Sequence, residues 1–82
     1  MKLYGFPETQ ESESVQAPEV LAEATLVATP AELRRIAQFL LDEAATMERL
    51  GATYSHAHLS DLDPEFQSSP NLIISSPSDH AV

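Results

Sequence analysis

Apolar side chains recur at helical spacing through the middle of the chain, between Thr29 and Gly51. The positions three or four residues apart form one stripe, which consists of Leu33, Ile36, Ala37, Leu40, Ala44 and Met47. Phe39 and Leu50 lie on one flank of that stripe. Because residues at this spacing share one face of an α-helix, the pattern predicts a long amphipathic helix that buries the stripe.

Residues at both ends of this segment are typical of helix termini. Thr29 is followed by Pro30 and then by Glu32, which is the spacing of a capping box. We expect the Thr29 hydroxyl to accept one free amide of the first turn, and the Glu32 carboxylate to accept the amide of Thr29. At the other end, Arg49 complements the helix dipole and Gly51 ends the helix.

Four shorter segments are predicted to be β-strands, at 1–6, 18–29, 53–59 and 71–75, and those at 18–29 and 53–59 have the alternating pattern. The connections on both sides of the helix are very short, which predicts a βαβ unit with parallel strands and a right-handed crossover. The segment at 71–75 would return antiparallel, and 1–6 would add an edge strand. The sequence therefore predicts an α+β fold, with one long helix on one face of a mixed sheet of three or four strands.

A chain of 82 residues is expected to form a single small domain, 1–82. Residues 7–17 carry charge, serine and glutamine without periodicity, and are predicted to be a loop or partly disordered. Residues 76–82 are predicted to be a frayed tail. No segment has the length and apolarity of a signal peptide or a membrane helix, so we expect a cytoplasmic protein without a membrane partner.

One helix covers only one face of such a sheet, and the other face must meet water or a partner. In the favoured register, the residues under the helix are Val20, Ala22, Ala24, Leu26, Ser55, Ala57 and Leu59. The open face then carries Leu21, Thr25, Val27, Tyr54, His56 and His58. A shift of one residue would exchange the two faces, and the pattern alone leaves that register open.

The net charge of −9 comes from 13 acidic residues against four lysine and arginine residues. This charge repels nucleic acid and anionic membranes, so neither is an expected partner. It suits a basic protein partner, although acidity also keeps small proteins soluble. The chain has no cysteine, which excludes disulfides and thiolate metal sites.

The histidines of "TYSHAHLSD" are the clearest candidates for chemistry. On a strand, His56 and His58 would share a face about 6.6 Å apart, so both rings could reach one metal ion. A catalytic zinc site needs three protein ligands, and the candidates Asp61, Asp63 and His80 are predicted to lie in a loop or the tail. We favour two half-exposed histidines on a sheet surface, with no metal and no cofactor.

Other catalytic arrangements find no support in the chain. No serine has the sequence context of a nucleophile elbow, and the only glycines are Gly5 and Gly51, so a phosphate-binding loop is absent. Asp61 and Asp63 are best interpreted as turn residues before Pro64. We therefore expect that the protein is not an enzyme. Phe66, an aromatic residue in a polar loop, either pins that loop to the core or anchors a partner, and pinning is the commoner role.

The order of "TPAELRRIAQFLLDEAATM", "HAHLSDLDPEF" and "SSPNLIISSP" resembles a family of bacterial immunity proteins from polymorphic-toxin systems, the immunity protein thirty-two family. The resemblance covers about residues 18–77, and "ETQESES" has no counterpart in it. It implies a non-enzymatic α+β protein that binds and blocks a cognate toxin. The positions that match the family pattern are His56, His58, Leu59, Asp61 and Asp63.

Together these observations predict a toxin-neutralising binding protein. The predicted partner-binding residues are Tyr54, His56, His58, Asp61, Asp63 and Phe66. Two alternatives remain at this point. One is a homodimeric structural or regulatory module in which two open sheet faces pack together. The other is a metal-binding protein that uses the His-Ala-His strand.

Overall fold

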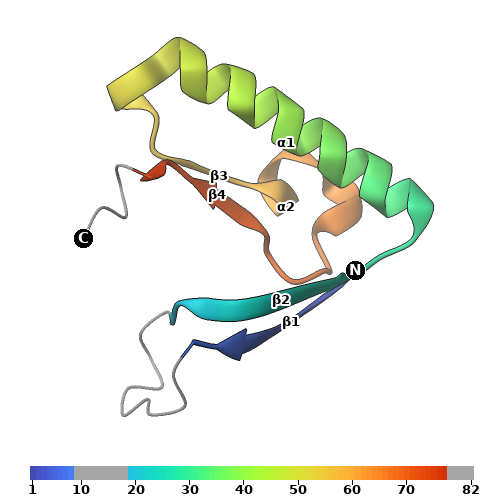
Figure 1. Ribbon diagram of the computed structural model, residues 1–82. Coiled ribbons are helices and arrows are strands. Elements are labelled where there is room, and N and C mark those ends of the chain that lie inside the picture. The colour runs from blue at the N-terminus through green and yellow to red at the C-terminus, as the bar shows by residue number, and fades with distance from the viewer. Residues whose placement is uncertain (9–18, 78–82) are drawn as a thin grey trace.

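The computed structural model describes residues 1–8 and 19–77, and it has the α+β class that the sequence predicts. The strands are β1 (Lys2–Pro7), β2 (Leu21–Val27), β3 (His56–His58) and β4 (Ile73–Ser75). The helices are α1 (Pro30–Leu50), α2 (Leu59–Leu62) and the single 3₁₀ turns η1 (Gly51–Thr53) and η2 (Pro64–Phe66). Figure 1 shows α1 along one side of the molecule, with both pairs of strands on its other side. The predictions for 7–17 and 76–82 fall mostly outside the described residues.

Both ends of α1 form as the sequence predicts. The amide of Glu32 donates to Thr29 Oγ1 at 3.1 Å, and the amide of Thr29 donates to Glu32 Oε1 at 2.9 Å, which completes the capping box. At the other end, Gly51 has a φ of 55° and its amide donates to the carbonyl of Met47. A residue with a side chain would be strained at this φ, so glycine suits the helix end.

The prediction of one mixed sheet is wrong, because the strands form two separate antiparallel pairs. β1 pairs with β2 from Lys2 opposite Val27 to Phe6 opposite Glu23, and the register shifts beyond Phe6. β3 pairs with β4 over three residues, with Ala57 opposite Ile74 at the centre. β2 and β3 therefore do not form the predicted parallel pair. Because β3 lies between η1 and α2, it is too short to add a long ladder to β2, and its nearest partner in the chain is β4.

The core lies between α1 and the segment from β3 to β4. It is a cluster of Ile36, Phe39, Leu59 and Phe66, and the partly buried residues packed against it are Met1, Ala28, Ala57, Leu72 and Ile74. The buried residues of α1 are Ile36, Phe39 and Glu43, whereas Leu33 and Leu40 of the predicted stripe are 45% and 42% exposed.

The helix is thus rotated about its axis relative to the prediction, and the face that carries Leu33 and Leu40 points away from the core. An aromatic side chain buries more apolar area than leucine, which favours placing Phe39 in the core cluster with Phe66.

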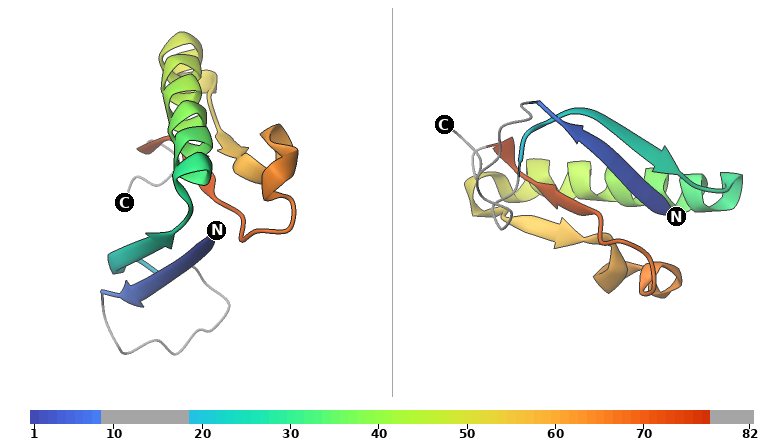
Figure 2. Two further views of the ribbon diagram at one scale, coloured as in Figure 1. Left: turned by 90° about the vertical axis from the view of Figure 1, so that its right-hand side faces the viewer. Right: turned by 90° about the horizontal axis from the view of Figure 1, so that it is seen from below.

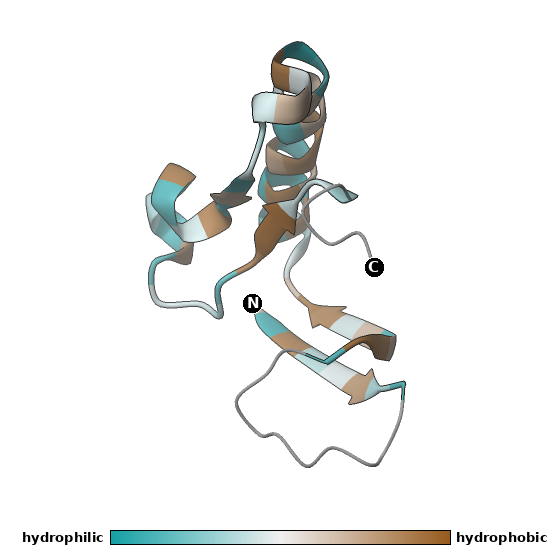
Figure 3. Ribbon diagram, turned by 90° about the vertical axis from the view of Figure 1, so that its left-hand side faces the viewer, coloured by the Kyte–Doolittle hydropathy of each residue, from teal (hydrophilic) through white to brown (hydrophobic). Residues whose placement is uncertain are grey.

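The β1–β2 hairpin extends away from this core, as the left-hand view of Figure 2 shows. All seven residues of β2 are exposed, including Ala22, Ala24 and Leu26, which were predicted to lie under the helix. Colouring by hydropathy shows apolar positions along both strands of the hairpin as well as on β4 (Figure 3). Within the described residues, no other element covers this hairpin. An isolated two-stranded hairpin has marginal stability in water, so we expect this one to be weakly held.

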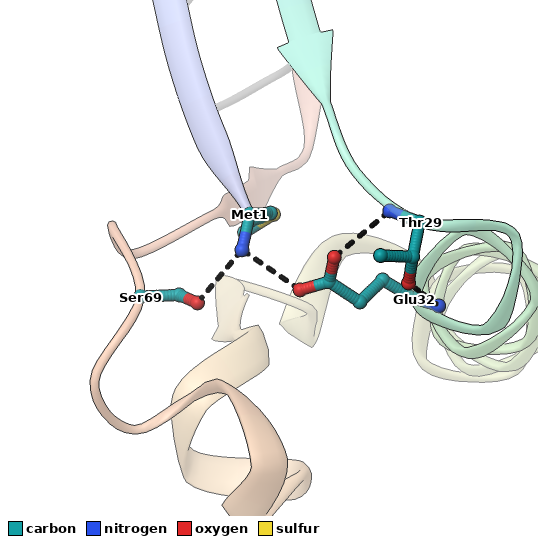
Figure 4. A network of polar contacts seen from close by, with 4 residues as sticks. All are labelled: Met1, Thr29, Glu32 and Ser69. Carbon is teal, nitrogen blue, oxygen red and sulfur yellow. Dashed lines mark hydrogen bonds and ion pairs between the residues drawn. The ribbon is translucent and has the colours of Figure 1, made fainter.

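Polar contacts at Met1 join three segments that are distant in the sequence (Figure 4). The Met1 amino group donates to Glu32 Oε2 at 2.8 Å and to Ser69 Oγ at 3.2 Å. Glu32 also belongs to the capping box, so one carboxylate connects the start of β1 with the start of α1. The bond from the ammonium group lowers the pKa of Glu32 below its ordinary value.

Within the described residues, no helix is long and apolar enough to cross a membrane.

Candidate partner-binding surface

The two histidines of β3 share one face of the strand, as their spacing predicts. Their ring centroids are 5.1 Å apart, with an angle of 62° between the ring planes. His56 is exposed and its Nδ1 lies 2.8 Å from Ser55 Oγ. His58 is half-buried, and its Nδ1 accepts from Asn71 Nδ2 at 2.8 Å. Each ring thus has one hydrogen-bond partner, and His56 is the more accessible of the two.

The carboxylates next to the histidine pair, Asp61 and Asp63, do not form a metal site with the two rings. Asp61 is exposed in α2, and Asp63 is engaged by a guanidinium group. His80 lies outside the described residues. Over residues 1–8 and 19–77, no three histidine, aspartate or glutamate side chains are placed so that they could hold one metal ion.

Tyr54 does not lie on the open surface, contrary to the prediction. It is 5% exposed, and its hydroxyl donates to Glu43 Oε1 at 2.9 Å. Burial, together with the bond to Glu43, raises the pKa of Tyr54. The turn η1 brings the chain back under α1, where the buried Glu43 needs a hydrogen-bond donor. Tyr54 therefore connects the start of the β3 segment to α1 from the buried side.

Phe66 pins its loop to the core, which decides between the two roles that the sequence left open. It is 1% exposed and belongs to the core cluster, so it is not available to anchor a partner. The turn η2 that positions it follows Asp63, whose Oδ1 accepts the amide of Glu65 at 3.1 Å. The proline-flanked loop is thus folded inward around its one aromatic side chain.

Asp63 joins this loop to α1. Arg35 Nε donates to Asp63 Oδ2 and Arg35 Nη2 donates to Asp63 Oδ1, both at 2.8 Å. The guanidinium holds the pKa of Asp63 below its ordinary value, and Asp63 in turn raises the pKa of Arg35. Both oxygens of Asp63 are already in use, so in this arrangement the side chain connects two elements of the fold.

A groove between α1 and α2 is a feature that the sequence did not predict. It has a volume of about 340 Å³. Its lining residues are Arg35, Gln38, Phe39, Asp42, Glu43, Leu59, Leu62 and Asp63. The one signal for it in the sequence is the acidic pair Asp42 and Glu43, which interrupts the side of the helix that carries Phe39.

Large apolar side chains are exposed on several elements. Within the described residues they are Tyr4, Phe6, Val20, Leu21, Leu26, Val27, Leu33, Leu40, Leu41, Leu50, Leu62 and Ile73. Most lie on the β1–β2 hairpin and on the outer face of α1. The buried apolar residues are fewer: Ile36, Phe39, Tyr54, Leu59 and Phe66. Within the described residues, the exposed large apolar side chains therefore outnumber the buried ones.

Comparison of the chain with protein-family models, with curated proteins and with solved structures gives no match in any of the three.

Proposed function

We propose that this chain is a non-enzymatic cytoplasmic protein that neutralises a cognate bacterial toxin by binding it directly. The observation that carries the proposal is the excess of exposed over buried large apolar residues in the described part of the chain. Covering these side chains with another macromolecule would stabilise a complex, because removal of apolar surface from water is favourable by about 25 cal/mol per Å².

The charge of the chain supports a basic partner. Thirteen acidic residues face four lysine and arginine residues, and one of those four, Arg35, is neutralised by Asp63. Complementary charge accelerates encounter with a basic protein and adds specificity to it. A basic toxin that acts on nucleic acid would fit this surface, since exposed carboxylates can occupy the place of phosphates.

The surface that we assign to the toxin includes His56, His58 and Asp61 from the predicted set. The exposed side chain of Ile73 belongs with them, because it lies opposite His58 in the β3–β4 ladder. Tyr54 and Phe66 act from below as supports, and Asp63 fixes the loop through Arg35. Binding would neutralise the toxin by covering its active surface, so the chain itself needs no catalytic group.

A genetic experiment tests this function. The gene next to the one that encodes this chain should encode a large secreted protein with a toxic C-terminal domain. Expression of that domain alone should stop growth, and co-expression of this chain should restore it. His56→Ala and Asp61→Asn should weaken the rescue, whereas Glu48→Gln on the exposed side of α1 should not. Absence of such a neighbour, or growth arrest that this chain leaves unchanged, would count against the proposal.

A homodimer is the second candidate, and the β1–β2 hairpin is the observation that favours it. All of β2 is exposed, and Val20 and Phe6 are 71% and 65% exposed. A second copy could cover this hairpin with its own. Light scattering coupled to size exclusion distinguishes the two candidates: a tight dimer that Leu26→Lys dissociates supports the module, and a monomer supports the toxin-binding protein.

A further inference from the structure

The groove between α1 and α2 combines an apolar floor with an acidic rim. Phe39 and Leu59 at its floor are 6% and 1% exposed, and Leu62 at its edge is 60% exposed. In the left-hand view of Figure 2, α2 lies to one side of α1, and residues of both helices line the groove. A volume of about 340 Å³ is at the lower end of the range of ligand sites, which suits one side chain.

Glu43 brings a carboxylate into this apolar setting. The residue is 8% exposed, and its Oε1 accepts the Tyr54 hydroxyl. Its Oε2 has no hydrogen-bond partner among the described residues. No side-chain oxygen in the described part of the chain is both sealed from solvent and unpartnered, so Oε2 must keep access to solvent. The groove, which Glu43 lines, provides that access.

The charges around the groove leave a negative excess. Three carboxylates and one guanidinium line it, for a net formal charge of −2. Arg35 and Asp63 satisfy each other through two bonds, so they leave Asp42 and Glu43 as the uncompensated pair. Asp42 accepts Gln38 Nε2 through Oδ1 at 2.8 Å and keeps its second oxygen free of any other described residue.

We propose that this groove binds an arginine side chain of a basic protein partner. The arginine methylenes would lie against Phe39 and Leu62, and the guanidinium would donate to Glu43 Oε2 and to the free oxygen of Asp42. Arginine suits the site better than lysine, because the guanidinium is less strongly hydrated and its planar donors can reach two carboxylates at once. The inference rests on the proposed function, since it names the chemistry by which the toxin would be recognised.

Short peptides test the groove without the toxin. The probe is acetyl-Gly-Arg-Gly-amide, and the matched control is the same peptide with citrulline, which is neutral and of nearly the same shape. Each peptide is titrated into the isotope-labelled full chain, and the backbone amide signals are followed by NMR. The signals of residues 38–43 and 59–63 should shift with the arginine peptide only. Added salt should weaken this binding.

Two variants with equal net charge separate the groove from general attraction. Glu43→Gln keeps an acceptor for Tyr54 but removes the charge, and should weaken binding of the arginine peptide about tenfold. Glu48→Gln removes the same charge from an exposed position that does not line the groove, and should bind within about twofold of the parent chain. If Glu43→Gln fails to fold, Asp42→Asn replaces it, because Asp42 is exposed and Gln38 retains an acceptor.

The inference is overturned if the citrulline peptide binds equally well, if the shifted amides lie elsewhere, or if the groove variants match Glu48→Gln. A toxin that binds Glu43→Gln as tightly as Glu48→Gln would also overturn it, while leaving the proposed function intact. Conversely, an arginine peptide that binds in the groove of a chain that does not rescue cells would refute the proposed function alone.

Discussion

The pair of Glu43 and Tyr54 shows how one residue departs from the apolar pattern of its element. Glu43 lies on the core side of α1, where a charged group is costly unless it is hydrogen-bonded. Tyr54 supplies the donor at 2.9 Å and is itself buried by doing so. Alternation in the segment 53–59 predicted that Tyr54 points outward. That prediction was wrong because sequence spacing does not reveal the hydrogen bond to Glu43, eleven positions earlier in the chain.

Tyr54→Phe should therefore destabilise the fold. It removes the donor from a buried carboxylate, and we expect the free energy of unfolding at neutral pH to fall by about 1–3 kcal/mol. Urea unfolding followed by circular dichroism measures the change. Tyr4→Phe is the matched control, because Tyr4 is 54% exposed and should tolerate the same change. Equal stability of the two variants would show that the Tyr54 bond contributes nothing.

The raised pKa of Tyr54 also predicts how stability depends on alkaline pH. The folded state favours the neutral phenol, so the unfolded chain releases this proton first as the pH rises. The free energy of unfolding should then fall above the ordinary tyrosine value of about 10. Absorbance titration at 295 nm should show a late-ionising tyrosine in the parent chain that is missing in Tyr54→Phe. Loss of the early component instead would contradict this assignment.

The Thr29 cap is a residue-scale feature that the sequence predicted fully. Thr29→Ala removes the acceptor of the Glu32 amide and should reduce the free energy of unfolding by about 1 kcal/mol. Thr46→Ala is the control within the same helix, because its hydroxyl only donates to the carbonyl of Asp42. That change should be neutral or slightly stabilising, since alanine is the better helix former. Chemical denaturation of both variants measures this difference, and equal losses would contradict the capping role.

At the scale of elements, the ends of α1 could be predicted and its rotation could not. Capping residues act locally, so Thr29 and Gly51 identify the helix ends without any tertiary information. The buried face depends on which partner packs against the helix. Two apolar sectors compete along α1, one with Leu33 and Leu40 and one with Ile36 and Phe39. The second sector is the one that packs in the core cluster with Leu59 and Phe66.

This competition gives a test of the helix orientation. Phe39→Ala should reduce the free energy of unfolding by about 3 kcal/mol or more, because it opens a cavity in the core. Leu40→Ala, at a position that is 42% exposed, should cost less than about 1 kcal/mol. Thermal unfolding of both variants measures the difference. A larger loss for Leu40→Ala would support the original stripe and a helix turned the other way.

The strands show the same division between local and distant information. The strand predictions at 1–6 and 18–29 identified β1 and β2, but the pairing of these strands with each other excluded the parallel βαβ sheet. Short connections around the helix permitted that topology without requiring it. The candidate site followed the sheet: His56 and His58 lie together at the surface, whereas Tyr54 and Phe66 are withdrawn into the core.

The exposed hairpin leads to a prediction about local stability. Without a partner, the amides that pair β1 with β2 should exchange with solvent much faster than those at the centre of α1, because few buried contacts hold the hairpin. Hydrogen exchange measured by mass spectrometry at several protein concentrations tests this. Protection in the hairpin that equals that of α1 at the lowest concentration would mean that the hairpin is already covered.

At the scale of the whole molecule, a small core carries a large uncovered apolar surface and a strong negative charge. The charge was evident from composition, whereas the exposed apolar area appears only once the fold shows which half of α1 and which sheet lack a neighbour. The proposed complex with a basic protein would cover part of this apolar surface and would pair part of this charge.

Calorimetric titration with the toxic domain encoded by the neighbouring gene tests whether this chain binds a basic toxin. We expect a one-to-one complex whose dissociation constant rises at least about tenfold between low and high salt. We also expect that Glu43→Gln weakens the complex more than Glu48→Gln. Absence of binding at micromolar concentrations, or an affinity indifferent to salt, would contradict the proposal that this chain binds a basic toxin.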